Sequence, residues 1–207
     1  DLGGTKILAG EFDSGYNCLF TDKNKTKAEL GYEGVTARIV ETIRGAAHLT
    51  RIDVAKSKGV GIGAPGTISA DGSTVLFAPN LDWRDVPLKA DLEAELGCPV
   101  WLGNDCSVAA MGIHRSEFES KPSDMVSIFL GTGIGAGIIT NGALLSGATQ
   151  AAGEVGHMVL DPDGPVCGCG TRCCYEALAS RTAIFNKVKA AVEAGEKTLL
   201  FDQMSKG

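Results

Sequence analysis

The segment 153–176, GEVGHMVLDPDGPVCGCGTRCCYE, constrains the fold most, because it gathers a histidine and four of the chain's seven cysteines in one short stretch. Thiolates and a neutral imidazole are the ligands of a tetrahedral Zn²⁺, and a site closed by four such ligands is structural. Gly168 and Gly170 allow the chain to curl around one small cation, and His157 would complete the ligand set. The cysteines of this segment are Cys167, Cys169, Cys173 and Cys174.

Two disulfides, or four inert thiols, are the alternative explanation of the same segment. Disulfides require an oxidising compartment, and nothing else in the chain indicates one. The sequence therefore favours a zinc site over disulfides.

Two motifs in this segment lie at a characteristic spacing. G-E-x-G-H at 153–157 is followed, ten residues after its histidine, by C-x-C-G-x-x-x-C-x-E at 167–176. This pair resembles the signature of the ROK family, which contains sugar kinases and repressors. The family pattern usually has glycine where this chain has Cys173, and if that glycine has φ > 0, a cysteine there costs about 1 kcal/mol of strain. Whether Cys173 or Cys174 binds the metal stays open. The zinc ligands implied by the family register are His157, Cys167, Cys169 and Cys174.

Two glycine-rich turns offer backbone N–H groups to an anion. Residues 1–13, DLGGTKILAGEFD, are typical of strand, turn and strand, and the P-loop pattern G-x-x-x-x-G-K-[ST] is absent. Residues 131–137, GTGIGAG, follow an apolar strand expected at 125–130 and match the relaxed dinucleotide pattern G-x-G-x-x-A. That pattern must open a helix, whereas Asn141-Gly142 is a strong signal for a two-residue hairpin. Alone, either turn is also consistent with an ordinary hairpin.

The resemblance gives the two turns a shared function. In the ROK family and the wider hexokinase–actin group, D-x-G-G-T-K is the first phosphate loop, and two such turns, one per lobe, are typical of the architecture. The implied phosphoryl donor is ATP, with polyphosphate as an alternative, accompanied by Mg²⁺ that is mostly ligated by water. Asp1 is a candidate second-sphere ligand of that magnesium. The residues expected to bind ATP are Asp1, Gly3, Gly4, Thr5, Lys6, Gly131, Thr132 and Gly133.

A candidate catalytic carboxylate follows a short strand expected at 99–102. Gly-Asn-Asp at 103–105 comes directly after this strand and precedes a helical stretch. Because ligands of open α/β sheets gather at the carboxyl ends of strands, Asp105 is either a helix N-cap or a functional group. In the kinases that this chain resembles, the catalytic base occupies this place. A carboxylate there can accept the proton of a sugar hydroxyl.

Recognition of a sugar takes side chains that both donate and accept hydrogen bonds. Besides a sugar contact, Asn80 is explained as a turn former, Glu154 as a turn cap and Glu176 as the start of a helix. His157 can bind metal through one ring nitrogen and offer the other to a hydroxyl. The resemblance implies these sugar-binding residues: Gly66, Asn80, Asn104, Asp105, Glu154, His157 and Glu176.

Apolar residues at helical spacing predict three more helices. The first covers about Gly34 to Lys58, the second covers 87–97, and the third covers 175–195. The apolar face of the third helix is expected to pack on a sheet. Residues 115–124 are polar, contain a proline, and are expected to form the loop between two lobes.

Composition excludes several classes of function. The 207 residues carry a net charge of −6 with no run of lysine or arginine, which argues against nucleic acid as the main partner. A hydrophobic content of 44% supplies a substantial core. No signal peptide and no apolar run long enough to span a bilayer are evident, and an odd number of cysteines fits a reducing cytoplasm. We expect a cytoplasmic protein without a membrane partner.

We therefore expect an α/β chain with a two-lobed actin-like (ribonuclease H-like) ATPase fold and a zinc-binding insertion, truncated at both ends. The N-terminal lobe, 1–118, is expected to hold the first phosphate loop and the catalytic aspartate. The incomplete C-terminal lobe, 119–207, is expected to hold the second loop and the zinc motif. Much of the adenine pocket is expected to come from residues after Gly207, so residues 1–207 alone are expected to show little turnover.

The activity implied by the resemblance is ATP-dependent phosphorylation of a hexose, glucose-like or an N-acetylhexosamine, at its 6-hydroxyl. The enzyme class is a hexokinase or glucokinase, expected to act as a homodimer. The alternative is a ROK-type sugar-sensing transcriptional regulator that lacks its DNA-binding domain. A third possibility is a zinc-organised interaction module without catalysis, for which both glycine turns would be coincidental.

Overall fold

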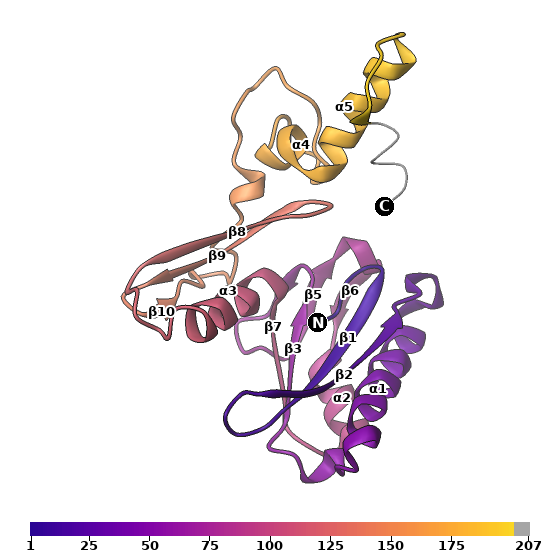
Figure 1. Cartoon of the computed structure of the whole chain (residues 1–207), viewed down its shortest axis with the longest axis vertical. Coiled ribbons are helices and arrows are strands. Elements are labelled where there is room, and N and C mark those ends of the chain that lie inside the picture. The colour runs from indigo at the N-terminus through magenta and orange to yellow at the C-terminus, as the bar shows by residue number, and fades with distance from the viewer. Residues whose placement is uncertain (201–207) are drawn as a thin grey trace. The chain divides into compact units, whose positions relative to one another are not determined.

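The computed structural model describes residues 1–200, which form two compact units. The first unit comprises residues 1–112 and 146–151, and the second comprises 113–145 and the residues from 152 onward. Each unit contains both helices and strands, as expected of an α/β chain (Figure 1). The predicted lobe boundaries, 1–118 and 119–207, stay a prediction.

The first unit contains three small sheets and the helices beside them. Its strands are β1 (Lys6–Phe12), β2 (Cys18–Lys25), β3 (Val60–Ala64), β4 (Thr67–Ile68), β5 (Val75–Ala78), β6 (Trp83–Val86) and β7 (Val100–Asn104). Its helices are α1 (Gly31–Thr50), α2 (Leu88–Leu96) and most of α3 (Asp105–Ser116), with short 3₁₀ turns η1 (Ala28–Leu30), η2 (Val54–Lys56) and η3 (Pro79–Leu81). The β1–β2 pair is antiparallel, β3 and β7 are parallel, and β5 lies between β4 and β6.

The core of the first unit lies where helices meet strands. Helix α1 contacts β1 and β2, and α2 contacts α1 and β7 (Figure 1). Val35, Leu92 and Val100 are fully buried there, and each such side chain contributes about 1.5–3 kcal/mol by leaving water. The ring of Tyr32 meets that of Trp83 edge-on, with 5.1 Å between centroids. This packing fixes β3 and β7, whose carboxyl ends precede two predicted site residues.

Two of the predicted helices of the first unit can be compared with the structure. Helix α2 lies between Pro87 and Gly97, which confirms the helix expected at 87–97. The helix expected from Gly34 to Lys58 is wrong at its end, because α1 stops at Thr50. Arg51 has φ 62°, a left-handed conformation that ends a helix, and residues 54–56 form the separate turn η2.

The second unit consists of a three-stranded antiparallel sheet, an irregular segment and two helices. Its elements are β8 (Met125–Leu130), β9 (Ile134–Thr140), β10 (Ala143–Leu144), η4 (Val155–His157), α4 (Tyr175–Ala179) and α5 (Arg181–Glu193). The sheet order is β10-β9-β8. Asn141 and Gly142 have φ of 50° and 74° and join β9 to β10, which confirms the predicted two-residue hairpin.

The single helix expected over 175–195 is wrong. Ser180 is extended, with φ −66° and ψ 161°, and separates α4 from α5. Its hydroxyl accepts a hydrogen bond from the backbone N–H of Ala183 at 3.1 Å, so it caps α5. Within α5, Ala183, Val188, Ala191 and Val192 are half-buried and Ile184 is 48% exposed, and the expected packing of this face on a sheet stays a prediction.

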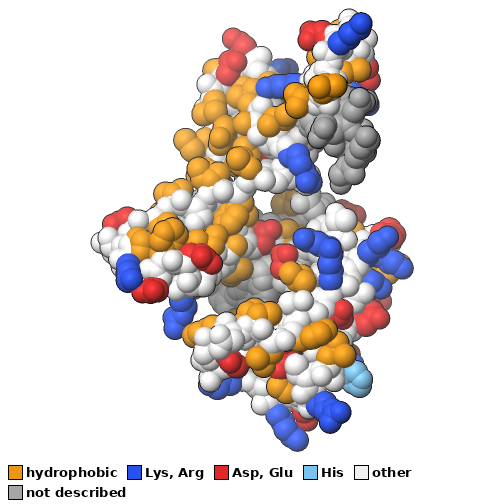
Figure 2. All heavy atoms as spheres, in the orientation of Figure 1, with side chains coloured by type: hydrophobic (Ala, Val, Ile, Leu, Met, Phe, Trp, Pro, Cys, Tyr) orange, Lys and Arg blue, Asp and Glu red, His pale blue; other side chains and the backbone are white. Residues whose placement is uncertain are grey.

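Hydrophobic side chains remain on the surface of the second unit. Val126, Ile128 and Leu130 alternate along β8 and are all exposed, and Figure 2 shows hydrophobic side chains gathered on the part of the molecule that contains β8 and β9. One face of this sheet therefore lacks a covering layer among the described residues. None of the helices within residues 1–200 has the length and apolar character that a bilayer crossing requires.

Candidate functional site

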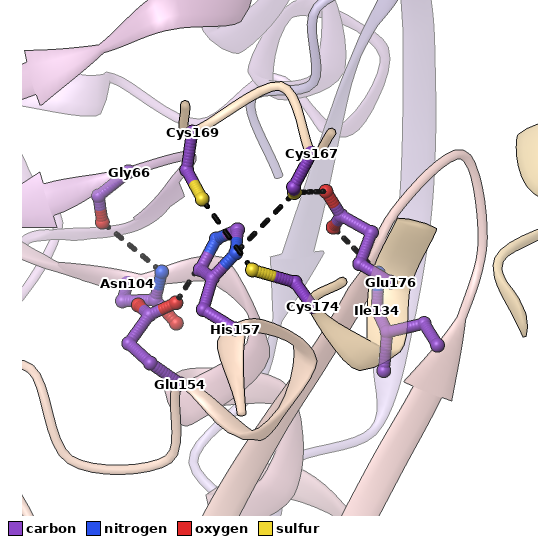
Figure 3. A network of polar contacts seen from close by, with 9 residues as sticks. All are labelled: Gly66, Asn104, Ile134, Glu154, His157, Cys167, Cys169, Cys174 and Glu176. Carbon is purple, nitrogen blue, oxygen red and sulfur yellow. Dashed lines mark hydrogen bonds and ion pairs between the residues drawn. The ribbon is translucent and has the colours of Figure 1, made fainter. Parts of the chain in front are cut away.

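The predicted metal ligands converge in the second unit. The ligand atoms of His157, Cys167, Cys169 and Cys174 all lie within 4.8 Å of one another (Figure 3). The Sγ atoms of Cys169 and Cys174 are 3.6 Å apart, and Nδ1 of His157 is 3.8 Å from Sγ of Cys167. A tetrahedral zinc with Zn–S bonds of about 2.3 Å holds its ligands about 3.8 Å apart, so these residues fit a four-coordinate ion. The 3.6 Å separation also exceeds a disulfide bond length of about 2.05 Å, and none of the seven cysteines forms a disulfide.

Short main-chain contacts bring the thiols together. The N–H of Cys167 donates to the carbonyl of Thr171 at 2.8 Å, and Gly170, with φ 88°, donates back to the carbonyl of Cys167 at 2.9 Å. This tight loop brings Cys169 to the same side as Cys167. A β-bridge between Val159 and Cys174 then aligns Cys174 with the segment that follows His157.

Cys173 lies in the left-handed region and points away from the ligand cluster. Its φ is 52°, its side chain is fully buried, and it is not among the four converging ligands. A Cβ on Gly164 would lie 1.9 Å from the Cys173 sulfur, so this sulfur occupies the space beside Gly164. The geometry therefore favours Cys174 over Cys173 as the fourth ligand.

The three converging thiols differ in acidity because they differ in environment. Hydrogen bonds from the backbone N–H and the side chain of Thr171 lower the pKa of the exposed Cys169 thiol to about 6. Burial raises the pKa of Cys174 to about 12 and also raises the pKa of Cys167. The two buried thiols would lose their protons on binding a cation, whereas the lowered pKa of Cys169 favours its thiolate form.

The G-E-x-G-H motif lies directly on the main chain of β9. A Cβ at Gly153 would be 2.8 Å from the carbonyl oxygen of Ala136, and a Cβ at Gly156 would be 2.1 Å from that of Ile134. Glycine is therefore required at both positions, and this close approach fixes the residues between and after them. Glu154 Oε2 lies 3.8 Å from Nε2 of His157, on the opposite side of the ring from the nitrogen that faces Cys167.

Glu176 connects the cysteine segment to the second glycine turn. Its Oε2 accepts the N–H of Ile134 at 2.9 Å, and its Oε1 lies 3.7 Å from Sγ of Cys167. A Cβ at Gly133 would be 2.2 Å from Glu176 Oε2, so glycine is needed there for this approach. The carboxylate thus contacts both the metal-ligand cluster and the residues that begin β9.

The second glycine turn presents N–H groups to one side. The carbonyl of Gly131 accepts the N–H of Arg181 at 3.0 Å, and the carbonyl of Thr132 accepts the hydroxyl of Thr182 at 2.8 Å. In a trans peptide the N–H points opposite to the carbonyl, so the N–H groups of Thr132 and Gly133 point away from α5. Successive N–H groups of this kind can bind an anion.

The first glycine turn is held in a similar way in the first unit. The hydroxyl of the fully buried Thr26 donates to the carbonyl of Gly3 at 2.6 Å, and its N–H donates to the carbonyl of Thr5 at 3.0 Å. The N–H of Gly4 consequently points away from Thr26. A Cβ at Gly4 would lie 3.2 Å from the Cβ of Asn80, so this turn lies beside the exposed Asn80 in η3.

The predicted catalytic carboxylate begins α3 at the carboxyl end of β7. Asn104, not Asp105, caps the helix, because its Oδ1 accepts the N–H of Ser107 at 3.0 Å. Its Nδ2 donates to the carbonyl of Gly66 at 3.1 Å (Figure 3). One oxygen of Asp105, Oδ1, accepts the N–H of Cys106 at 2.8 Å. Gly66 has φ 85°, and a Cβ there would lie 2.0 Å from the carbonyl oxygen of Phe77.

The predicted site residues fall into two groups, one set belonging to each unit. Asp1 belongs to the first group and pairs with Leu8 through its main chain. In the first unit the group comprises Asp1, Gly3, Gly4, Thr5, Lys6, Gly66, Asn80, Asn104 and Asp105. In the second unit it comprises Gly131, Thr132, Gly133, Glu154, His157, Cys167, Cys169, Cys174 and Glu176.

No sequence pattern pointed to Thr26 and Thr182, the two threonines that hold the glycine turns. Thr26 lies 23 residues from Gly3, and Thr182 lies 50 residues from Thr132. Neither residue belongs to a recognisable motif. Only the structure shows that Thr26, between Lys25 and Lys27, is fully buried, and a buried hydroxyl needs a hydrogen-bond partner.

Comparison with known proteins agrees with this arrangement. The glucokinase of Streptomyces coelicolor is 40% identical over 194 residues, which cover 94% of this chain and 59% of that protein. The crystal structure of a ROK family glucokinase from Streptomyces griseus, in complex with glucose and AMPPNP, has a TM-score of 0.82 at 39% identity and covers 93% of this chain and 60% of that one. A ROK family transcriptional regulator, a homolog of the E. coli MLC protein, has a TM-score of 0.82 at 27% identity, with 97% of this chain and 50% of that one covered.

The chain thus spans about three fifths of the length of the two glucokinases. Its similarity to their structures identifies the fold as that of the actin-like ATPases. The model of the ROK family matches residues 1–207, and so the chain belongs to the ROK family.

Proposed function

We propose that this chain belongs to an ATP-dependent sugar kinase that phosphorylates a hexose, glucose-like or an N-acetylhexosamine, at its 6-hydroxyl. The observation that carries the proposal is Asp105, which follows β7 while Asn104 takes the capping role. The identity of about 40% with a glucokinase supports a glucose-like acceptor. The glucokinase structure with glucose and AMPPNP supports ATP as a donor.

The proposed chemistry needs little covalent work from the protein, because positioning and charge stabilisation supply most of the rate of phosphoryl transfer. The N–H groups of the turns at 3–6 and 131–133 would bind the phosphates of ATP, with the Thr132 hydroxyl as a further donor. Asp105 would accept the proton of the attacking hydroxyl late in the transfer. Mg²⁺, held by the phosphates and water with Asp1 nearby, would neutralise developing charge.

The structural metal is proposed to be zinc, held by His157, Cys167, Cys169 and Cys174. The ligand separations and the three thiolates support this choice over harder cations. The expected sugar contacts Glu154, His157 and Glu176 all lie in or next to this cluster, so the ion would hold them in one frame. Nε2 of His157, on the side of the ring away from the thiols, would be free to bind a sugar hydroxyl.

The remaining sugar contacts are proposed in the first unit. Gly66 and Asn104 are joined by a hydrogen bond, so their orientation is fixed before a ligand binds. Asn80 lies beside Gly4 and could therefore contact both sugar and phosphate turn. We also propose that the protein is cytoplasmic and forms a homodimer. Light scattering on the purified protein would test the dimer.

The decisive test is a coupled kinase assay on the intact protein that contains residues 1–207, with glucose, mannose, fructose, N-acetylglucosamine and N-acetylmannosamine as acceptors. Asp105→Asn keeps the acceptor for the Cys106 N–H but removes the base. We expect kcat to fall by about 10²–10⁴-fold, with sugar affinity within about threefold of wild type. An unchanged kcat would refute the assignment of Asp105 as the base.

The second candidate is a sugar-sensing regulator, favoured by the structural similarity to the ROK family transcriptional regulator. A regulator would bind a sugar through the same residues without phosphorylating it. Sugar binding without turnover of any acceptor would favour this alternative, whether or not the protein binds ATP.

A further inference from the structure

Arg181 makes two separate contacts with the second glycine turn. Its backbone N–H donates to the carbonyl of Gly131 at 3.0 Å, and its Nη2 donates to Oγ1 of Thr132 at 3.4 Å. The first contact belongs to the main chain and survives any substitution of the side chain except proline. The second depends on the guanidinium alone, so the two contributions can be separated by mutation.

The positive charge of the Arg181 guanidinium and most of its N–H donors are available to a ligand. Among the described residues, no carboxylate lies within ion-pair distance of it, whereas Lys189 on the same helix pairs with Glu193 at 3.8 Å. A guanidinium has five N–H donors in a planar fork, and the bond to Thr132 uses one of them. The side chain is exposed, so the remaining donors can reach a ligand.

The same contact orients the hydroxyl of Thr132. An oxygen that accepts a hydrogen bond from arginine directs its own hydrogen elsewhere, and it therefore acts as a donor to a third group. The main-chain N–H groups of Thr132 and Gly133 are also free to donate on the side away from α5. The Thr132 hydroxyl and the guanidinium, which contact each other, are both donors suited to phosphate oxygens.

The carboxylate of Glu176 lies next to the second glycine turn and would repel a phosphate bound there. Glu176 accepts the N–H of Ile134 directly after the turn and so places a carboxylate next to it. A phosphate bound here would be repelled by this charge. A cation that contacts the same turn offsets the repulsion, and Arg181 provides one.

We propose that Arg181 is a phosphate-binding residue, whose guanidinium contacts the terminal phosphates of the phosphoryl donor and holds the Thr132 hydroxyl in its donating orientation. This inference rests on the proposed kinase function and names a residue outside both glycine motifs. The ligand chemistry is a chain of linked phosphates, so magnesium tripolyphosphate is a probe that needs no adenine pocket.

The test is calorimetric titration of magnesium tripolyphosphate into the intact protein, for wild type, Arg181→Gln and Arg181→Lys. Glutamine keeps an N–H for Thr132 but removes the charge and the fork, and we expect the Kd to rise by about tenfold or more. Lysine keeps the charge without the fork, so its affinity should lie between the other two. In turnover assays, Arg181→Gln should raise KM for ATP and leave KM for the sugar unchanged.

Lys189→Gln is the matched control, because it removes one positive charge from the same helix away from the turn and should bind tripolyphosphate like wild type. Equal affinities for wild type and Arg181→Gln would overturn the role of Arg181 and leave the kinase proposal intact. Equal losses in Arg181→Gln and Lys189→Gln would also overturn it, since helix charge alone would then explain the effect. A wild-type protein that binds sugar but not tripolyphosphate would overturn the kinase proposal itself.

Discussion

A single side chain, Cys173, shows how a substitution in a motif is accommodated. The residue keeps the left-handed φ of 52° that glycine adopts easily, and its sulfur fills the space beside Gly164. Gly164 does not have a positive φ, so the barrier to a larger residue there is Cys173, whose Sγ and Cβ would lie 1.9 and 2.7 Å from an added Cβ. Gly164 and Cys173 therefore form a pair whose sizes depend on each other.

This pair gives a prediction for stability. Gly164→Ala places a methyl group against the Cys173 sulfur, and we expect it to lower the free energy of unfolding by about 1–3 kcal/mol. Cys173→Gly removes the sulfur that the new methyl group would meet. The free energy of unfolding of the double variant should therefore exceed the value expected from adding the two single changes by about 0.5–3 kcal/mol. Urea denaturation of the four proteins measures this coupling. Strict additivity would show that the two residues do not touch.

Each glycine turn depends on an element far away in the chain. The turn at 131–133 is held by the first residues of α5, and the turn at 3–6 is held by Thr26 just after β2. In both, a threonine hydroxyl binds a carbonyl that would otherwise be free to rotate toward a phosphate. Because a carbonyl oxygen repels an anion, the hydroxyl keeps the donor side of the turn clear.

Removal of one of these hydroxyls should weaken nucleotide binding. Thr182→Val preserves the shape of the side chain but leaves the Thr132 carbonyl without its 2.8 Å donor. We expect KM for ATP to rise about three- to tenfold and the sugar KM to stay constant, since a hydrogen bond of this kind contributes about 1 kcal/mol. Thr21→Val, on the exposed side of β2, is the control and should match wild type. A Thr182→Val enzyme with normal KM for ATP would show that the turn needs no such restraint.

At the scale of the whole molecule, the metal cluster organises a segment with little regular structure. Between β10 and α4 the described chain has one 3₁₀ turn, η4, and two isolated β-bridges, so no strand ladder or α-helix holds it. An ion bound by residues spread from His157 to Cys174 would replace the missing restraints. The second unit should therefore depend on metal more than the first.

Metal removal tests this dependence. The purified protein should contain about one equivalent of zinc, and chelation should lower the unfolding temperature and weaken sugar binding. Because burial raises the pKa of Cys167 and Cys174, zinc must displace their protons, and its affinity should rise as pH increases from 6 to about 8. A zinc content below half an equivalent, or an unfolding temperature that the chelator does not change, would rule out a structural zinc.

The sequence predicts those parts of the fold that depend on the conformational preferences of neighbouring residues. Asn141-Gly142 needs φ > 0 at both positions, and that requirement alone predicted the hairpin of β9 and β10. The prediction of a single helix over 175–195 was wrong because the composition of the segment favours one helix, whereas Ser180 caps a second helix within it. Thr26 and Thr182 were missed because their contacts span 23 and 50 residues, and no local pattern encodes a partner so distant.

The threonine hydroxyls that hold the turns have a practical consequence for how such proteins are surveyed. If the turns bind ATP as proposed, a homologue or natural variant can keep both glycine motifs unchanged and still lose nucleotide affinity through one missing hydroxyl elsewhere in the chain. Classification of these chains as active or inactive should therefore score positions 26 and 182 alongside the signature residues.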